Sequence, residues 1–344
     1  MGLLSRSTGT TDAPIAGTDA VLADLDGVVY RGPGAIPHAV ESLNGIADSG
    51  IRVGYITNNA SRTDAQVAAH LSDLGLRVAP DDVITSPQAA IALLKEQVAP
   101  GSLILVVGGD GITVELERAG FRMTRSADDR PDAVIQGFAP NVAWTDLAEA
   151  SFALARDIPW VATNQDWTIP VERGIAPGNG TLVSAVHTAV QKLPIVAGKP
   201  EKAIFEEGVR RFGVADPLFI GDRLDTDIKG ARAVGMRSAL VLTGVDRAKQ
   251  VIAAPPEQRP DYLLEDLRGL TEPYPVVKVE SRPEFATARV GREQVSVDGI
   301  DVRVDSKGAS RIDLLRAAAA AIGASGKLIY ALRVPAVLYE DWTA

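Results

Sequence analysis

Two segments of the sequence place several carboxylates directly after a run of apolar residues. Asp24 and Asp26 follow the first run, and Asp222, Asp225 and Asp227 follow the second. Functional groups in open α/β sheets collect beyond the carboxyl ends of strands, and residues two apart on a strand point the same way. Like charges so close are costly unless a proton or a cation lies between them, and hard oxygen donors suit Mg²⁺. The segments therefore indicate a magnesium site, although each alone also fits an Asp-Gly turn or a capped helix start.

Two further segments carry groups that can bind an anion. Thr57, Asn58 and Asn59 follow the apolar run Arg52–Ile56, and Lys199 stands between a glycine and a proline. A hydroxyl and backbone N–H groups at a helix N-terminus form an anion site, and a lysine offers a point charge to a phosphate. Taken alone, the first segment is more often an ordinary helix cap and the second an exposed surface lysine.

The elements that must position these residues alternate along the chain from residue 18 to residue 272. Seven apolar runs are typical of buried parallel strands: Ala20–Ala23, Arg52–Ile56, Leu103–Val107, Ala133–Ile135, Trp160–Ala162, Leu218–Ile220 and Ala239–Leu242. Apolar residues at helical spacing occur in Ala39–Ala47, Asp64–Leu74, Ala89–Val98, Thr113–Ala119, Leu147–Ala155, Leu182–Gln191, Lys202–Phe212 and Asp227–Val234. This alternation predicts an α/β fold with mainly parallel sheets.

The pattern changes near residue 273. Short alternating segments typical of antiparallel hairpins follow: Val276–Val279, Phe285–Val290, Gln294–Val297 and Ile300–Val304. A helix is expected over Arg311–Ile322 and an apolar strand over Leu328–Leu332. These residues predict a separate small α+β module. It distantly resembles a fragment of the N-acetyltransferase fold but is too short for a complete one, so we expect a structural or interaction unit.

Length and composition limit the classes of protein that the chain can belong to. At roughly 100–200 residues per domain, 344 residues predict two or three domains. The formal net charge of −9 argues against a nucleic-acid partner, and the lack of cysteine excludes disulfides and a thiol nucleophile. With no signal-peptide pattern and no apolar run long enough to span a membrane, we expect a cytoplasmic protein.

In order along the chain, DxDGVVY, TNN, GKP and GDxxxxD resemble the four motifs of the haloacid dehalogenase (HAD) superfamily of phosphotransferring hydrolases. The chain looks like the branch with a large C2-type cap, which includes phosphoglycolate, p-nitrophenyl phosphate and glycerol phosphate phosphatases. The resemblance implies a Rossmann-like core with a parallel sheet and an inserted α/β cap. The implied layout is a flexible tail at 1–17, the core at 18–84 and 191–272, the cap at 85–190 and the α+β module at 273–344.

The resemblance also implies roles for individual residues. Asp24 would be the nucleophile and Asp26 the general acid and base. Magnesium would bind the carboxylates of Asp24 and Asp222 and the backbone carbonyl of Asp26. The other implied residues are Thr57, the Asn58 backbone and Lys199 for the phosphoryl oxygens, Asp227 and Asn59 just outside these groups, and Asn164, Asp166, Trp167 and Asn179 on a cap loop facing the substrate.

The function implied is a Mg²⁺-dependent phosphomonoesterase that forms an aspartyl-phosphate. With its C-terminal extension the chain is most similar to actinobacterial glycerol-3-phosphate phosphatases, so glycerol 3-phosphate is the expected substrate. A phosphoglycolate phosphatase and a broad-specificity p-nitrophenyl phosphatase are alternatives within the family. A phosphorylatable receiver is an alternative of another class, although its single small domain would not need 344 residues. The expected partner is a small phosphate ester, with a homodimer through the cap or the C-terminal module as a further expectation.

Overall fold

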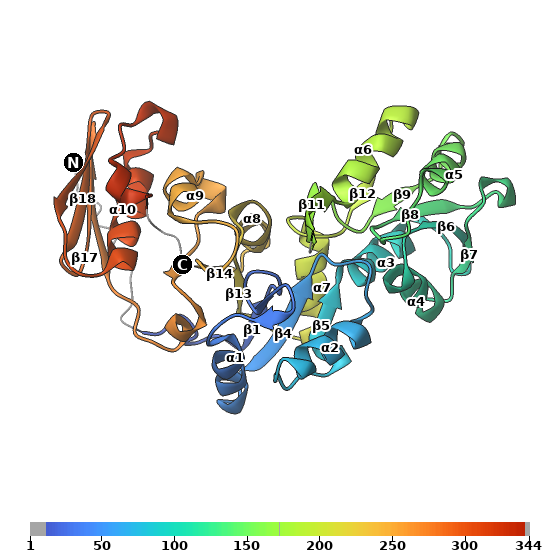
Figure 1. Cartoon of the computed structure of the whole chain (residues 1–344), viewed down its shortest axis with the longest axis horizontal. Helices are drawn as coiled ribbons and strands as arrows, with labels where there is room; N and C mark the ends of the chain where they lie inside the picture. Colours follow the sequence, from blue (N-terminus) through green and yellow to red (C-terminus); the bar gives the residue numbers. More distant parts are fainter. Residues whose placement is uncertain (1–11, 172, 341–344) are drawn as a thin grey trace. The chain divides into compact units, whose positions relative to one another are not determined.

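The computed structural model describes residues 12–171 and 173–340 of the chain (Figure 1). Its contacts divide the chain into two compact units, the first made of Met1–Arg52 with Asp216–Ala344 and the second of Val53–Ala215. The N-terminal tail expected at 1–17 lies outside the described residues up to position 11. Its later part is bonded to the first unit, because the backbone N–H of Ile15 donates to Leu270 and the carbonyl of Asp12 accepts from Tyr274, both at 3.3 Å.

Parallel strands in the order β15-β14-β13-β1 form the sheet of the first unit. Their bounds are β1 Ala20–Ala23, β13 Pro217–Gly221, β14 Arg237–Val241 and β15 Tyr262–Leu264. The helices and short strands of the same unit are β2 Tyr30–Arg31, β3 Gly34–Ala35, α1 Ala39–Asp48, α8 Lys229–Ala233 and α9 Ala248–Ala253, with a π-helical turn over Leu224–Ile228. β1 and β13 are fully buried, as expected for parallel strands covered on both faces. Because they run parallel, their carboxyl ends lie at the same edge of the sheet.

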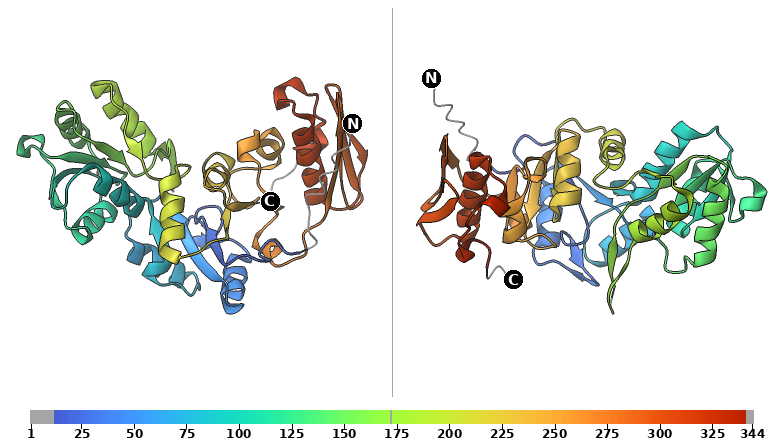
Figure 2. Two further views of the ribbon diagram at one scale, coloured as in Figure 1. Left: turned by 180° about the vertical axis from the view of Figure 1, so that it is seen from behind. Right: turned by 90° about the horizontal axis from the view of Figure 1, so that it is seen from above.

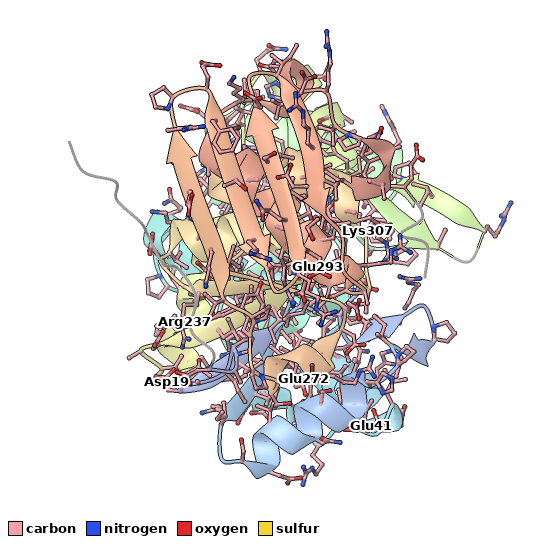
Figure 3. All side chains as sticks on the ribbon, turned by 90° about the vertical axis from the view of Figure 1, so that its left-hand side faces the viewer. Asp19, Glu41, Arg237, Glu272, Glu293 and Lys307 are labelled. Atoms are coloured by element: carbon pink, nitrogen blue, oxygen red, sulfur yellow. The ribbon has the colours of Figure 1, made fainter. Side chains whose placement is uncertain are left out.

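The C-terminal part of the first unit is an antiparallel sheet with one helix against it (Figure 2). Its strands are β16 Val277–Arg282, β17 Phe285–Val290, β18 Glu293–Asp298 and β19 Asp301–Ser306, and the helix is α10 Arg311–Ser325. The buried carboxylate of Glu293, labelled in Figure 3, accepts the backbone N–H of Ser310 at 3.0 Å, just before α10 begins. The α+β character predicted for this region is confirmed.

The strand expected over Leu328–Leu332 is wrong. These residues contain a 3₁₀ turn at Ile329–Ala331, in which backbone N–H groups donate to carbonyls three residues back. After this turn, Arg333 pairs with Asp301 of β19 through an isolated β-bridge. A continuous apolar run predicted a strand here, but local turn bonds satisfied the backbone instead.

The C-terminal module shares one hydrophobic core with the parallel sheet. Leu224, Ile228 and Leu263 belong to the same buried cluster as Ala286 and Leu315 of the module. The module also covers the outer edge of β15. The backbone N–H of Leu263 donates to the Tyr274 hydroxyl at 3.0 Å, and its carbonyl accepts from the Arg316 guanidinium at 2.6 Å. An exposed sheet edge invites pairing with other chains, so this cover protects the sheet.

The second unit contains a parallel sheet in the order β12-β9-β8-β6-β7, together with the parallel pair β4–β5 and the hairpin β10–β11. Its strands are β4 Arg52–Thr57, β5 Val83–Thr85, β6 Leu103–Val107, β7 Arg122–Thr124, β8 Ala133–Gln136, β9 Trp160–Ala162, β10 Thr168–Val171, β11 Gly174–Pro177 and β12 Ile195–Val196. Its helices are α2 Asp64–Asp73, α3 Ser86–Gln97, α4 Asp110–Arg118, α5 Trp144–Leu154, α6 Asn179–Val190 and α7 Lys202–Phe212. Within the described residues, no helix is both long and apolar enough to cross a membrane.

Candidate active site

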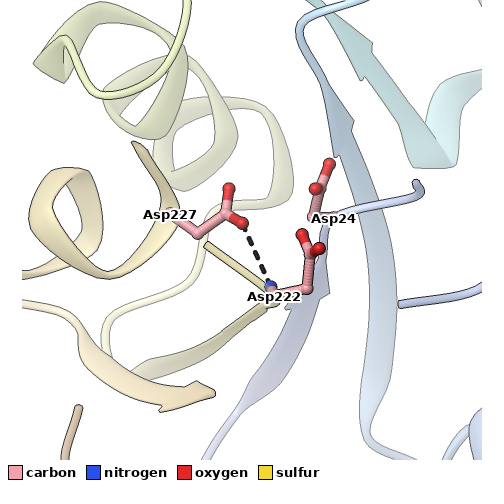
Figure 4. A group of neighbouring side chains, drawn as sticks. All are labelled: Asp24, Asp222 and Asp227. Carbon is pink, nitrogen blue, oxygen red and sulfur yellow. Dashed lines mark hydrogen bonds between the residues drawn. The ribbon is translucent and has the colours of Figure 1, made fainter. Parts of the chain in front are cut away.

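A group of three buried aspartates lies at the carboxyl edge of the parallel sheet in the first unit (Figure 4). Asp24 follows β1, Asp222 follows β13, and Asp227 lies in the π-helical turn after Asp222. One carboxylate oxygen of each lies within 4.8 Å of those of the other two. The sequence expected Asp24 and Asp222 to meet because parallel strands end together, and the structure brings them together.

Backbone N–H groups hold two of these carboxylates, those of Asp222 and Asp227, in place. One oxygen of Asp227 accepts the N–H group of Asp222 at 3.1 Å (Figure 4). The same oxygen accepts the N–H group of Arg223, also at 3.1 Å. The Asp222 carboxylate accepts the N–H of Val245 at 2.5 Å. These bonds from the backbone fix the positions of the Asp222 and Asp227 carboxylates.

Two glycines leave the space that the Asp222 carboxylate occupies. A Cβ added to Gly244 would lie 1.8 Å from Asp222 Oδ2, and one added to Gly27 would lie 2.3 Å from the same atom. Gly27 also has a φ of +82°, a backbone conformation that other residues rarely adopt. The Thr243 hydroxyl donates to the Gly27 carbonyl at 2.7 Å and joins the two glycine loops. Larger residues at either position would displace Asp222.

The donor set fits a divalent cation that prefers oxygen ligands. Three carboxylates with little solvent around them repel each other, and a bound Mg²⁺ would offset that repulsion while accepting their oxygens. The Asp26 side chain is not in this group; Asp26 is exposed in the turn after β1. A backbone carbonyl is the contribution expected of Asp26 toward a metal, and that assignment stays a prediction.

Asp246 also belongs to this site, although none of the four motifs contains it. Its carboxylate accepts the Leu224 N–H at 2.6 Å, and its own N–H donates to the Asp222 carbonyl at 3.1 Å. Burial is the main cause that raises the pKa of the Asp246 carboxyl. The available signal was its place after β14, a neighbour of β13 in the sheet, because polar residues at the ends of adjacent strands converge.

In the second unit, Asn58 and Lys199 form a second polar group. The Lys199 N–H donates to Asn58 Oδ1 at 2.7 Å, and Asn58 Nδ2 donates to the Lys199 carbonyl at 3.1 Å. Thr57 and Lys199 are both buried, and the Thr57 hydroxyl accepts the Asn59 N–H at 3.1 Å. The Asn59 side chain accepts the N–H of Ser61 at 2.9 Å and so holds a local turn. The structure thus joins the TNN and GKP segments, which are far apart in the sequence.

The loop expected to face the substrate reaches the same asparagine. Asn58 Nδ2 donates to Asp166 Oδ1 at 3.1 Å, and Asn164 Nδ2 donates to the Asn58 carbonyl at 2.8 Å. Asn179 is buried and donates to the Asn164 carbonyl at 2.8 Å, so its amide supports the loop from inside. Trp167 is 65% exposed. Substrate contacts of these residues stay a prediction.

Comparisons with known proteins agree with the motifs. A family model described as haloacid dehalogenase-like hydrolase matches residues 21–122, and a HAD-hydrolase-like model matches residues 196–270. The chain is 43% identical to the D-glycerol 3-phosphate phosphatase of Mycobacterium tuberculosis, over 84% of this chain and 79% of the relative. It is 34% identical to the glycerol-3-phosphate phosphatase of Gallus gallus, over 76% of this chain and 93% of the relative.

Solved structures give the same likeness. A glycerol phosphate phosphatase from Mycobacterium tuberculosis in complex with magnesium has a TM-score of 0.81 and 40% identity, and the match covers 92% of this chain and 94% of that one. A p-nitrophenyl phosphatase from Archaeoglobus fulgidus has a TM-score of 0.68 and 26% identity, and the match covers 74% of this chain and 98% of that one. The second match leaves a quarter of the chain without a counterpart.

Proposed function

The chain belongs to the haloacid dehalogenase-like hydrolase family and is a phosphoric monoester hydrolase, and we propose that it converts glycerol 3-phosphate and water to glycerol and phosphate. The extent of the likeness carries the choice of substrate. The glycerol phosphate phosphatase covers 92% of the chain, more than residues 1–272 can supply, whereas the p-nitrophenyl phosphatase covers 74%. The likeness to the first protein therefore extends into the C-terminal module.

Magnesium is the cofactor. The buried carboxylates of Asp24 and Asp222 and the backbone carbonyl of Asp26 would hold it. Asp227 would orient Asp222, because its carboxylate accepts backbone N–H groups of the loop after β13 that carries Asp222. When bound, the metal compensates charge so that an anionic nucleophile can approach an anionic phosphate. Support for this assignment comes from the burial of the carboxylates and their oxygen-only donor set.

Two aspartates carry out the chemistry in this proposal. A carboxylate oxygen of Asp24 attacks phosphorus in line, the bond from phosphorus to the glycerol oxygen breaks, and an aspartyl-phosphate forms. Asp26 gives its proton to the departing alkoxide. It then takes a proton from water, whose oxygen attacks the phosphorus and releases Asp24 and phosphate. The exposed turn position of Asp26 gives its carboxyl access to water and to a leaving group.

The polar group of the second unit would hold the substrate. Thr57, the Asn58 N–H and Lys199 are proposed to bind the phosphoryl oxygens, where charge shifts in the transition state. The loop with Asp166 and Trp167 is proposed to contact the glycerol end, with Asn164 and Asn179 fixing its backbone. A cap at 85–190 that excludes water during the reaction is part of the same proposal.

The test is phosphate release by the purified full-length protein. Glycerol 3-phosphate, phosphoglycolate and p-nitrophenyl phosphate should each be offered with Mg²⁺ and after complete chelation, with Asp24→Ala as the inactive control. The proposal expects metal-dependent turnover and the highest kcat/KM for glycerol 3-phosphate. A higher value for phosphoglycolate, or equal values for all three esters, would replace the substrate by one of the alternatives. Undiminished activity of Asp24→Ala would contradict the mechanism.

Two further expectations accompany this function. A cytoplasmic location is checked by fractionation of the producing cells, with the activity expected in the fraction free of membranes. A homodimer through the cap or the C-terminal module is checked by sedimentation of the full chain, with the mass of two chains as the expected result.

A further inference from the structure

We propose that the Asn58 side chain is a positioning residue that couples the phosphate-binding lysine to the loop that contacts the glycerol end of the substrate. The proposal rests on the proposed function, because it assigns those roles to Lys199 and Asp166. It adds a role for the side-chain amide of Asn58, which neither binds the substrate nor takes part in the reaction. All the contacts that carry it lie within the second unit.

The first contact fixes the backbone of Lys199. Asn58 pairs with both polar backbone groups of that residue, accepting its N–H at 2.7 Å and donating to its carbonyl at 3.1 Å. The segment has little room to shift, because a Cβ on Gly198 would lie 2.6 Å from Asn58 Oδ1 and 2.6 Å from the Thr163 carbonyl. A two-point pair in so tight a space determines where the Lys199 side chain starts.

The second contact fixes the carboxylate of Asp166. The Asn58 amide nitrogen has two hydrogens, and it donates to Asp166 Oδ1 at 3.1 Å as well as to the Lys199 carbonyl. The backbone of Asp166 is bonded in addition, since its N–H donates to Asn164 Oδ1 at 3.1 Å and its carbonyl accepts from Gly180 at 2.9 Å. One side chain thus holds a lysine backbone and a loop carboxylate at the same time.

Asn58 can serve as a fixed point because its own backbone is held. Its carbonyl accepts the Ser86 hydroxyl at 2.7 Å and the Asn164 amide at 2.8 Å. These bonds tie the end of β4 to the start of α3 and to the loop after β9. A change at Asn58 should therefore affect Lys199 and Asp166 together, because one held side chain bonds to both.

The coupling has a consequence for substrate choice. A carboxylate at Asp166 can accept hydrogen bonds from the hydroxyl groups of glycerol, whereas p-nitrophenol offers none once its oxygen is esterified. Misplaced buried polar partners cost more than a missing apolar contact. Loss of the Asn58 bond to Asp166 should then lower turnover of glycerol 3-phosphate more than turnover of p-nitrophenyl phosphate.

The experiment reverses the direction of the hydrogen bond. Asn58→Asp sets two carboxylates against each other, and the double variant Asn58→Asp with Asp166→Asn restores one donor and one acceptor. For each protein, kcat and KM are measured for both esters, together with the inhibition constant of inorganic phosphate. Asn141→Asp makes the same chemical change at an exposed turn before α5 and is the matched control.

The expected result is a loss of about tenfold or more in the ratio of the two kcat/KM values for Asn58→Asp. The double variant should recover most of that ratio, while the inhibition constant of phosphate stays raised because the Lys199 carbonyl still lacks its donor. Asn141→Asp should match the wild type. No recovery in the double variant, or equal losses for both esters, would overturn the coupling.

A second variant keeps the proposal testable if Asn58→Asp does not fold. Asp166→Ala should lower the substrate ratio and leave phosphate inhibition unchanged, and a raised inhibition constant there would contradict independent binding of phosphate by Lys199. A wild type that hydrolyses p-nitrophenyl phosphate but not glycerol 3-phosphate would refute the proposed substrate. The positioning of Lys199 by Asn58 would then be judged on phosphate inhibition, which should be weakened in Asn58→Asp and unchanged in Asp166→Ala, and this measurement needs no glycerol ester.

Discussion

Both units of the chain place buried or partly buried acidic side chains next to each other, but the surroundings of the two groups differ. In the first unit, Asp24, Asp222 and Asp227 bring their oxygens together around a common point. In the second unit, Asp64 at the start of α2 and Glu115 on α4 share one cation, because Arg118 bonds to Asp64 at 2.7 Å and to Glu115 at 2.6 Å. Part of the negative charge is compensated there by a cation of the protein itself.

Neutral donors complete the second group. The amide of Gln88 on α3 donates to Asp64 at 3.1 Å, so three helices meet at one polar cluster. The pKa of Glu115 is nevertheless raised, mainly by burial and further by Asp64, while Arg118 acts in the opposite direction. Neighbouring acids in the interior therefore do not by themselves make a metal site. Convergence of three carboxylates, with glycines clearing the space, distinguishes the first group from the second.

The largest expected effect separates the two groups by activity. Asp24→Asn removes the nucleophile, and kcat should fall by about four orders of magnitude. Asp64→Asn makes the same change in the other acidic group and should keep kcat near the wild-type value. Phosphate release at saturating Mg²⁺ measures both. Comparable losses in the two variants would mean that the groups are not functionally distinct.

The next effect tests the space around Asp222. Gly244→Ala adds a Cβ where the Asp222 carboxylate lies, and the affinity for Mg²⁺ should fall by about 10- to 100-fold. Titration calorimetry without substrate measures this directly. Gly45→Ala on α1, where the added Cβ meets no atom within 4 Å, is the control and should bind the metal normally. Normal binding by Gly244→Ala would show that Asp222 does not need its present position.

A smaller effect concerns the internal cation of the second group. Arg118→Met leaves the buried Asp64 and the partly buried Glu115 without their cation. The free energy of unfolding should fall by roughly 1–3 kcal/mol, and the lower part of the range is expected because Arg118 is half exposed. Urea unfolding measures the loss, and Mg²⁺ affinity should not change. A drop in metal affinity would link the two acidic groups.

The smallest expected effect is the pH dependence of Glu115→Gln. The folded protein raises the pKa of Glu115, so the unfolded chain releases that proton at a lower pH. As pH rises from the pKa of the unfolded chain to that of the folded protein, Glu115 lowers the free energy of unfolding. Glutamine has no such dependence. The free energy of unfolding of Glu115→Gln, relative to wild type, should therefore increase from about pH 4 to neutral pH. A decrease over the same interval would show that the pair with Arg118 outweighs burial.

Much of the fold could be predicted from apolar patterns. The strands Leu103–Val107 and Trp160–Ala162 and the helix Lys202–Phe212 have the predicted bounds. Four helices start three residues earlier than predicted, at Ser86, Asp110, Trp144 and Asn179. The first turn of a helix is often polar or capped and carries little of the apolar period, so periodicity alone places the start too late.

Some residues of the candidate site could likewise be predicted from the sequence and others could not. Asp24, Asp222 and Lys199 could be selected because their residue types follow strands or precede helices in a fixed order. Asp246 offered only its place after β14 as a signal. Its contacts and those of the Asn58 side chain could not be predicted, because the partners lie 22 and 108 residues away and no local pattern records such contacts. At Leu328–Leu332 the opposite happened. The local apolar pattern predicted a strand, but the backbone groups bond within a turn instead.

The sequence by itself determined the chemistry of this protein: two carboxylates after a buried strand, a threonine, a lysine and a second set of carboxylates, in an order typical of one family of phosphatases. Only the tertiary structure decided how those groups are held. Glycines at 27 and 244 leave room for one carboxylate, and Asn58 joins a lysine to a distant loop. The physical reason is that reactivity depends on residue type, which is local, whereas positions depend on packing and hydrogen bonds between segments far apart in the chain.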